Sequence, residues 1–173
     1  MLRDLGTLAA RLFIGGSFAA HGAQKAFGWF GGYGPAATAG FMESLGFAPG
    51  APYARAASST EIASGLAIAL GLGGPLGPAG LASVMTVAIA TVHGKNGFFA
   101  QDGGYELPAV YIAAAFALAN VGYGRYSLDA ALGDPFASER LALPALLGGI
   151  ASGLYTAGRR TPPAPAEGSG QAT

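Results

Sequence analysis

Residues 21–32 read HGAQKAFGWFGG, and they follow directly on the apolar run of residues 5–20. His21, Gln24 and Lys25 are spaced i, i+3, i+4, so they share one face of a helix. Aromatic side chains come next, as they do where a membrane helix meets the interface; they are Phe27, Trp29, Phe30 and Tyr33. The stretch predicts a membrane helix that ends in a polar site flanked by aromatic rings.

A second segment has the same pattern. Residues 92–99 read VHGKNGFF and close another apolar run, with His93, Asn96 and Phe98 in corresponding roles. Two helix ends of this kind predict one polar site at one membrane face.

The composition is that of a membrane protein. Of 173 residues, 51% are hydrophobic and only 10% are charged, whereas a soluble domain carries about 25% charged residues. There are 30 glycines, and small residues let membrane helices approach closely. The zero net charge gives no indication of a nucleic-acid partner, and the lack of Cys excludes thiol catalysis, disulfides and iron–sulfur clusters held by this chain. We predict an all-α integral membrane helical bundle.

Five apolar segments are predicted to form it. Four core transmembrane helices are expected at about residues 5–27, 53–72, 78–93 and 106–123. Residues 141–158 are expected to form a shorter fifth, with a helix lying in the interface as the alternative. Residues 28–52 are expected to be an ordered loop containing a short helix. The transmembrane domain is thus placed at residues 1–158, and residues 159–173 are expected to be a disordered tail.

Two further features of the helices leave alternatives open. Arg11, inside the first apolar run, argues against a cleaved signal peptide; it is expected to pair with Glu61 or helix carbonyls, or to reach the interface on its own side. Gly149 and Gly153 form one small-residue face that packs either inside the bundle or between copies of the chain. The distribution of Lys and Arg does not decide the membrane orientation.

Glu61 is the most informative ionisable residue. It lies about two turns into the second predicted helix, where a carboxylate is costly unless it is paired, protonated or facing a wet cavity. One interpretation is a proton-accepting or ligand-binding carboxylate. The other is a structural ion pair with Lys25, His21 or Arg11.

The short links between the helices bring the polar ends together on one side. His21, His93 and Glu61 form a ligand set known for metals, but no local His-x-x-His or Glu-x-x-His spacing occurs, and we predict no metal site. No motif of a soluble enzyme is found, so catalytic residues are not assigned and enzyme activity is left open. The predicted ligand-binding residues are His21, Gln24, Lys25, Trp29, Glu61, His93, Asn96 and Phe98.

Several stretches together resemble the DoxX family. They are RLFIGGSFAAHGAQKAFGWFGG at residues 11–32, TAGFMESLG at 38–46, VHGKNGFF at 92–99, GYE at 104–106 and GYGRYSLD at 122–129. The resemblance covers residues 5–132 and implies a small bacterial membrane protein of four core helices, located in the plasma (inner) membrane. The chain departs from this pattern by adding residues 141–158 and by lacking a charged residue in the turn at 71–78.

The resemblance also implies a link to redox chemistry. Relatives called DoxD form a membrane subunit of thiosulfate:quinone oxidoreductase, and others resemble partners of superoxide dismutase and a sulfurtransferase in a membrane complex tied to oxidative stress. The first hypothesis is therefore a redox-associated membrane subunit that binds a quinone as its cofactor. The alternatives are a non-catalytic scaffold for redox or sulfur-transfer enzymes, and a small-solute or proton conduit. The expected partners are the lipid bilayer, a redox enzyme or sulfurtransferase, and further copies of the chain, with no nucleic acid.

Overall fold

A computed structural model describes residues 1–136 and 139–161, and within these ranges the chain is helical with no strand. The all-α fold class is confirmed. The α-helices are α1 (Leu2–Phe27), α2 (Gly34–Ser44), α3 (Gly50–Leu70), α4 (Leu76–Ala88), α5 (Glu106–Val121), α6 (Leu128–Ala131) and α7 (Glu139–Gly158). The predicted tail lies outside the described residues from residue 162 onward.

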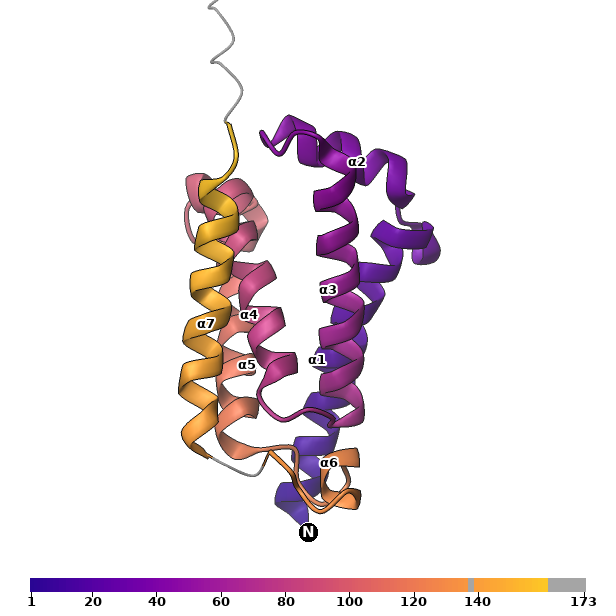
Figure 1. The fold of residues 1–173 in the computed structure, drawn as a ribbon, viewed down its shortest axis with the longest axis vertical. Helices are drawn as coiled ribbons and strands as arrows, with labels where there is room; N and C mark the ends of the chain where they lie inside the picture. Colours follow the sequence, from indigo (N-terminus) through magenta and orange to yellow (C-terminus); the bar gives the residue numbers. More distant parts are fainter. Residues whose placement is uncertain (137–138, 162–173) are drawn as a thin grey trace, which may run out of the picture.

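The helices form two groups (Figure 1). The first consists of α1 and α3 side by side, with α2 lying across their end, and the second consists of α4, α5 and α7. The α2 helix is the short helix expected within residues 28–52. The two groups meet at a core between α1, α3, α4, α5 and α7 that includes Phe18, Ile68, Leu81, Ala115 and Leu146.

Glycines set the distance between helices within each group. A Cβ atom on Gly15 of α1 would lie 2.5 Å from the backbone of α3, and one on Gly22 would lie 2.8 Å from Ser58 O. In the second group, a Cβ atom on Gly153 of α7 would lie 2.5 Å from Ser83 O of α4. The small-residue face of α7 therefore packs inside the bundle, against α4.

The described helices differ in how well their length and hydropathy fit a membrane span. Two stretches, Leu76–Asn96 and Arg140–Gly158, are long and apolar enough to cross a bilayer. The second is the predicted shorter fifth helix. The apolar helix α5 has 16 residues. The helices α1 and α3 have 26 and 21 residues, but Arg11 and Glu61 interrupt their apolar sequence.

Beyond α4, the chain continues through a π-helical turn, Ile89–His93, and a 3-10 turn, Gly94–Asn96. A π-helical turn contains an extra residue and therefore changes the direction of the side chains that follow, and such turns are frequent at functional sites. His93 is the last residue of this turn.

The loop between α5 and α6 is hydrogen-bonded to α1 and to the α3–α4 turn, at the end of the bundle opposite His93. The buried Arg11 side chain donates from Nη1 to Tyr123 O and from Nη2 to Tyr126 O, both at 2.8 Å. The Asp129 carboxylate accepts hydrogen bonds from the N–H groups of Gly73 and Gly74, at 2.9 and 2.7 Å. Arg11 thus pairs with loop carbonyls rather than with Glu61, and the motif at residues 122–129 joins α1 to the turn between α3 and α4.

Candidate functional site

A cavity of about 520 Å³ lies between the two helix groups, on the side where α1 ends and α3 begins. Its walls come from all the long helices and from α2. Most of its lining is apolar, including Phe18, Met42, Phe47, Met85 and Leu107. Such a cavity has the size and character of a site for a small lipid-soluble molecule.

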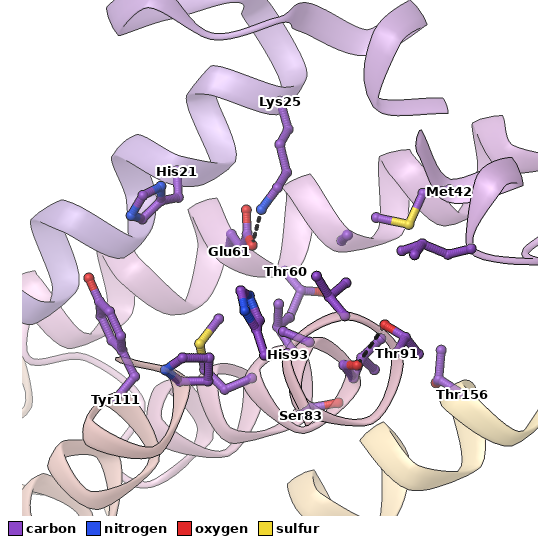
Figure 2. Close-up of a pocket in the computed structure, with 18 of the residues that line it drawn as sticks. His21, Lys25, Met42, Thr60, Glu61, Ser83, Thr91, His93, Tyr111 and Thr156 are labelled. Atoms are coloured by element: carbon purple, nitrogen blue, oxygen red, sulfur yellow. Dashed lines mark hydrogen bonds and ion pairs between the residues drawn. The ribbon is translucent and has the colours of Figure 1, made fainter. Parts of the chain in front are cut away.

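Four of the predicted ligand-binding residues line this cavity: His21 and Lys25 from α1, Glu61 from α3 and His93 after α4. Figure 2 shows Lys25 and Glu61 joined between the helices, with His21 beside them and His93 on the facing element. The hydroxyl groups of Ser83, Thr91 and Thr156 lie in another part of the view, nearer α7.

Glu61 and Lys25 form an ion pair across α1 and α3. The Lys25 ammonium donates to Glu61 Oε1. The Glu61 side chain is 2% exposed, whereas that of Lys25 is 33% exposed. The carboxylate is therefore held inside the protein, and the ammonium lies at the edge of the site.

The second oxygen of the same carboxylate has no partner. Glu61 Oε2 is buried and makes no hydrogen bond to any described residue. A buried polar atom without a partner costs about 1–3 kcal/mol, more where it is charged, so native structures nearly always provide one. Glu61 also lines the cavity, so this carboxylate belongs to the wall of the site.

His21 is oriented by its neighbour on the same helix face. Its Nδ1 lies 3.1 Å from Gln24 Oε1, and Gln24 Nε2 donates to Phe30 O at 3.3 Å. Gln24 lies outside the main cavity and lines an adjoining hollow together with His21 and Lys25. Its role here is to position His21 and the loop after α1.

His93 is oriented by the loop before α5. Its Nδ1 lies 2.7 Å from Gly103 O, and Asn96 Nδ2 donates to the same carbonyl at 3.1 Å. Asn96 is exposed and braces this loop instead of lining the cavity. The imidazole is thus held by backbone, with Nε2 left available.

Two predicted aromatic residues lie outside the cavity. Trp29 and Phe98 are 59% and 48% exposed and do not line it. Trp29 stacks near Phe27, and Phe98 packs edge-on against Phe99 and Tyr105. Their exposure fits the interfacial anchoring expected of membrane aromatics.

Tyr111 of α5 is one of the polar cavity residues that sequence reasoning missed. Its hydroxyl lies 2.9 Å from Ser17 Oγ of α1, and its ring lines the cavity and tilts against Phe18. The signal was a single hydroxyl within an otherwise apolar stretch, residues 107–119. A buried Tyr needs a hydrogen-bond partner, so its position in mid-helix could have indicated a contact between helices.

Within residues 1–136 and 139–161, no three His, Asp or Glu side chains are grouped so that they could hold a metal ion. At the far end of the bundle, burial and the nearby Asp129 carboxylate raise the pKa of the Tyr123 hydroxyl above its usual value. That hydroxyl therefore stays protonated at neutral pH, and the centre of the Tyr123 ring lies 5.6 Å from the Arg11 guanidinium carbon.

Comparison with known proteins gives one result. The model of the DoxX family matches residues 6–94, just over half of the chain. No curated protein and no solved structure matches the sequence. The matched segment contains α1 from its fifth residue onward, α2, α3, α4 and the π-helical turn, and hence His21, Lys25, Glu61 and His93.

Proposed function

The chain belongs to the DoxX family of membrane proteins, and we propose that it binds a quinone or a similar lipid-soluble ligand in the cavity beside Glu61. In this proposal α1, α3, α4 and α5 are the four core membrane spans of residues 1–158, and α7 is the fifth. The protein would reside in the bacterial plasma membrane and serve redox or oxidative-stress chemistry.

The observation that carries the binding proposal is the cavity itself. It combines about 520 Å³ of space and largely apolar walls with one buried, unpartnered carboxylate oxygen. A ligand with an apolar body and a polar ring substituent matches both features, because apolar walls bind the body and a few placed polar groups fix its orientation.

The distribution of charge along α1 and α3 supports the membrane proposal. Arg11 and Glu61, which interrupt their apolar sequence, are buried, whereas Phe13 and Leu66 are 74% and 49% exposed. Charges that face the bundle interior while large apolar side chains face outward are typical of membrane helices. Helices with this pattern can span a bilayer although their average hydropathy is modest.

A redox role would need a bound carrier or a partner. The chain has no Cys, so its side chains offer no thiol couple, and the electrons would pass through the quinone or a partner enzyme. A redox enzyme or a sulfurtransferase at the membrane is the partner class that the family resemblance implies.

The test compares two alanine substitutions two residues apart. Ala88 lines the cavity, whereas Ala90 is exposed and does not. Ala88→Phe should fill the cavity and strongly reduce the quinone and quinol that copurify in mild detergent. Ala90→Phe adds the same ring outside and should leave that content unchanged. Solvent extraction followed by chromatography measures both.

Two results would contradict the binding proposal. If the wild-type protein holds no quinone or quinol, even after reconstitution with added quinone, the scaffold hypothesis is favoured. If proteoliposomes show proton or solute flux that Ala88→Phe blocks while no quinone is bound, the conduit hypothesis is favoured.

A further inference from the structure

We propose that the cavity selects a ligand head that donates hydrogen bonds, so that it binds a quinol in preference to the corresponding quinone. The inference rests on the proposed function and specifies which redox form the site holds. A quinol carries two O–H donors, whereas a quinone carries only carbonyl acceptors. The two forms otherwise share nearly the same size and apolar surface.

The unpartnered oxygen of Glu61 is the first reason. Lys25 donates to Oε1 in an ion pair, and the carboxylate of an ion pair can only accept hydrogen bonds. The missing partner of Oε2 must therefore be a donor. A quinol hydroxyl meets this requirement, and a quinone carbonyl placed there would bring two acceptors together.

The two histidines add further acceptors. The Nδ1 of His93 faces the carbonyl of Gly103 at 2.7 Å, and because a carbonyl only accepts, that nitrogen carries the proton. The Nδ1 of His21 likewise faces Gln24 Oε1, whose amide orientation is fixed by the bond from Nε2 to Phe30 O. In the neutral form of each ring, Nε2 is then an acceptor.

The hydroxyl of Tyr111 is committed in the same way. Ser17 Oγ lies 3.1 Å from Ile14 O, its acceptor, and 2.9 Å from the Tyr111 hydroxyl; with the Ser17 proton given to Ile14, we assign the second bond to donation by Tyr111. The Tyr111 oxygen can then only accept further hydrogen bonds. Acceptors thus line the cavity from α1, α3, α5 and the turn after α4.

Lys25 is the one cationic side chain that lines the cavity among the described residues, and its ammonium has two protons besides the one given to Glu61. These protons can bond the oxygen of either a quinone or a quinol, so they do not discriminate between them. Glu61 Oε2 does discriminate, because a quinone leaves it unpaired. A hydrogen bond to a charged group is strong enough to favour the quinol by about tenfold to a hundredfold.

The first test uses three ligands and the unmodified protein. Decylhydroquinone, its dimethyl ether and decylbenzoquinone share one tail, and only the first has O–H donors. Their dissociation constants for the purified protein in detergent are measured by equilibrium dialysis, with dithionite keeping the hydroquinone reduced. Since the chain has no Cys, the reductant leaves its covalent structure unchanged. We expect decylhydroquinone to bind at least tenfold more tightly than the other two.

The second test replaces the carboxylate. Glu61→Gln keeps an oxygen for Lys25 and places an NH₂ donor where Oε2 lies, so the preference should fall below threefold or turn toward the quinone. Glu106→Gln is the matched control, because Glu106 is outside the cavity and its Oε2 accepts the N–H of Ala100. That variant should keep the wild-type preference. Helical circular dichroism and gel filtration verify that both variants are folded.

The outcomes separate this inference from the proposed function. Equal affinity for all three ligands, with binding abolished by Ala88→Phe, would overturn the selectivity and leave quinone binding intact. A preference for the dimethyl ether or the quinone in the wild type would overturn it as well. No binding of any ligand would overturn the proposed function itself.

Discussion

Removal of Lys25 should damage the fold far more than removal of Glu61, although the two form one ion pair. The Glu61 side chain is 2% exposed, whereas that of Lys25 is 33% exposed and can turn outward. Lys25→Met therefore leaves a buried, uncompensated carboxylate, which costs about 3–5 kcal/mol of unfolding free energy. Glu61→Met removes the buried charge and frees Lys25, so its cost should be about 1 kcal/mol, as for a volume-conserving core change.

The double variant makes the comparison quantitative. Lys25→Met combined with Glu61→Met removes both charges, and its stability should lie within about 1.5 kcal/mol of wild type. With single losses of about 3–5 and about 1 kcal/mol and a double loss of about 1.5 kcal/mol, the double-mutant cycle gives a coupling energy of about 2.5–4.5 kcal/mol, at or above the upper end of values for residues in contact. The second substitution would thus rescue the first.

The assay is equilibrium unfolding of the detergent-solubilised protein, followed by helical circular dichroism. Lys95→Met is the matched control, because Lys95 is exposed and makes no ion pair with a described residue. It should change the unfolding free energy by less than about 0.5 kcal/mol. Equal losses for Lys25→Met and Glu61→Met, or a double variant as unstable as Lys25→Met, would refute the asymmetry.

The remaining predictions concern the packing that positions the site. Gly15→Ala should lower the unfolding free energy by about 1–3 kcal/mol, because its Cβ would lie 2.5 Å from Gly65 O. Gly16→Ala places a Cβ with no atom within 4 Å, so it should raise the unfolding free energy by about 0.5–1 kcal/mol. Asp129→Asn should cost about 1–3 kcal/mol, because one of two partly buried turn amides then faces an NH₂ group. Asp134→Asn, on an exposed residue, is its control, and thermal melting in detergent measures all four.

The sequence was sufficient for the helices and for the pairing of their polar ends. Period-3.6 spacing placed His21 and Lys25 on one face of α1, and short links brought α3 and the end of α4 to the same side, where Glu61 and His93 line one cavity. The shared face follows from helix geometry, and the common side follows from the short links between helices. Both can be predicted from the sequence without knowing how the helices pack.

The aromatic residues show where such reading fails. Trp29 follows Gly28, which is left-handed at φ 71°, and Phe30 has φ 52°, so the chain reverses direction just after α1. Phe98 follows Gly97 at φ 79° in a similar turn. Helical periodicity ends at such residues, and the side chains beyond them point where the turn directs them. Both rings consequently lie outside the cavity that adjacency in sequence predicted.

Arg11 shows a second limit. Its depth in α1 indicated that it must have a partner, but the partners are carbonyls of Tyr123 and Tyr126, more than a hundred residues away. Backbone carbonyls carry no sequence signature, because every residue has one. The need for a partner was predictable, and the partner itself depends on how the α5–α6 loop folds back on α1.

The two interpretations of Glu61 that the sequence left open apply to different atoms. Oε1 accepts from Lys25 and joins α1 to α3, while Oε2 has no partner and belongs to a residue that lines the cavity. A glutamine at this position keeps an oxygen that accepts from Lys25 and replaces Oε2, an acceptor, with an NH₂ donor. Loss of Lys25, by contrast, leaves Oε2 in place but removes the charge that makes a buried carboxylate tolerable. Substitutions of these two residues therefore separate what stabilises the fold from what would select the ligand.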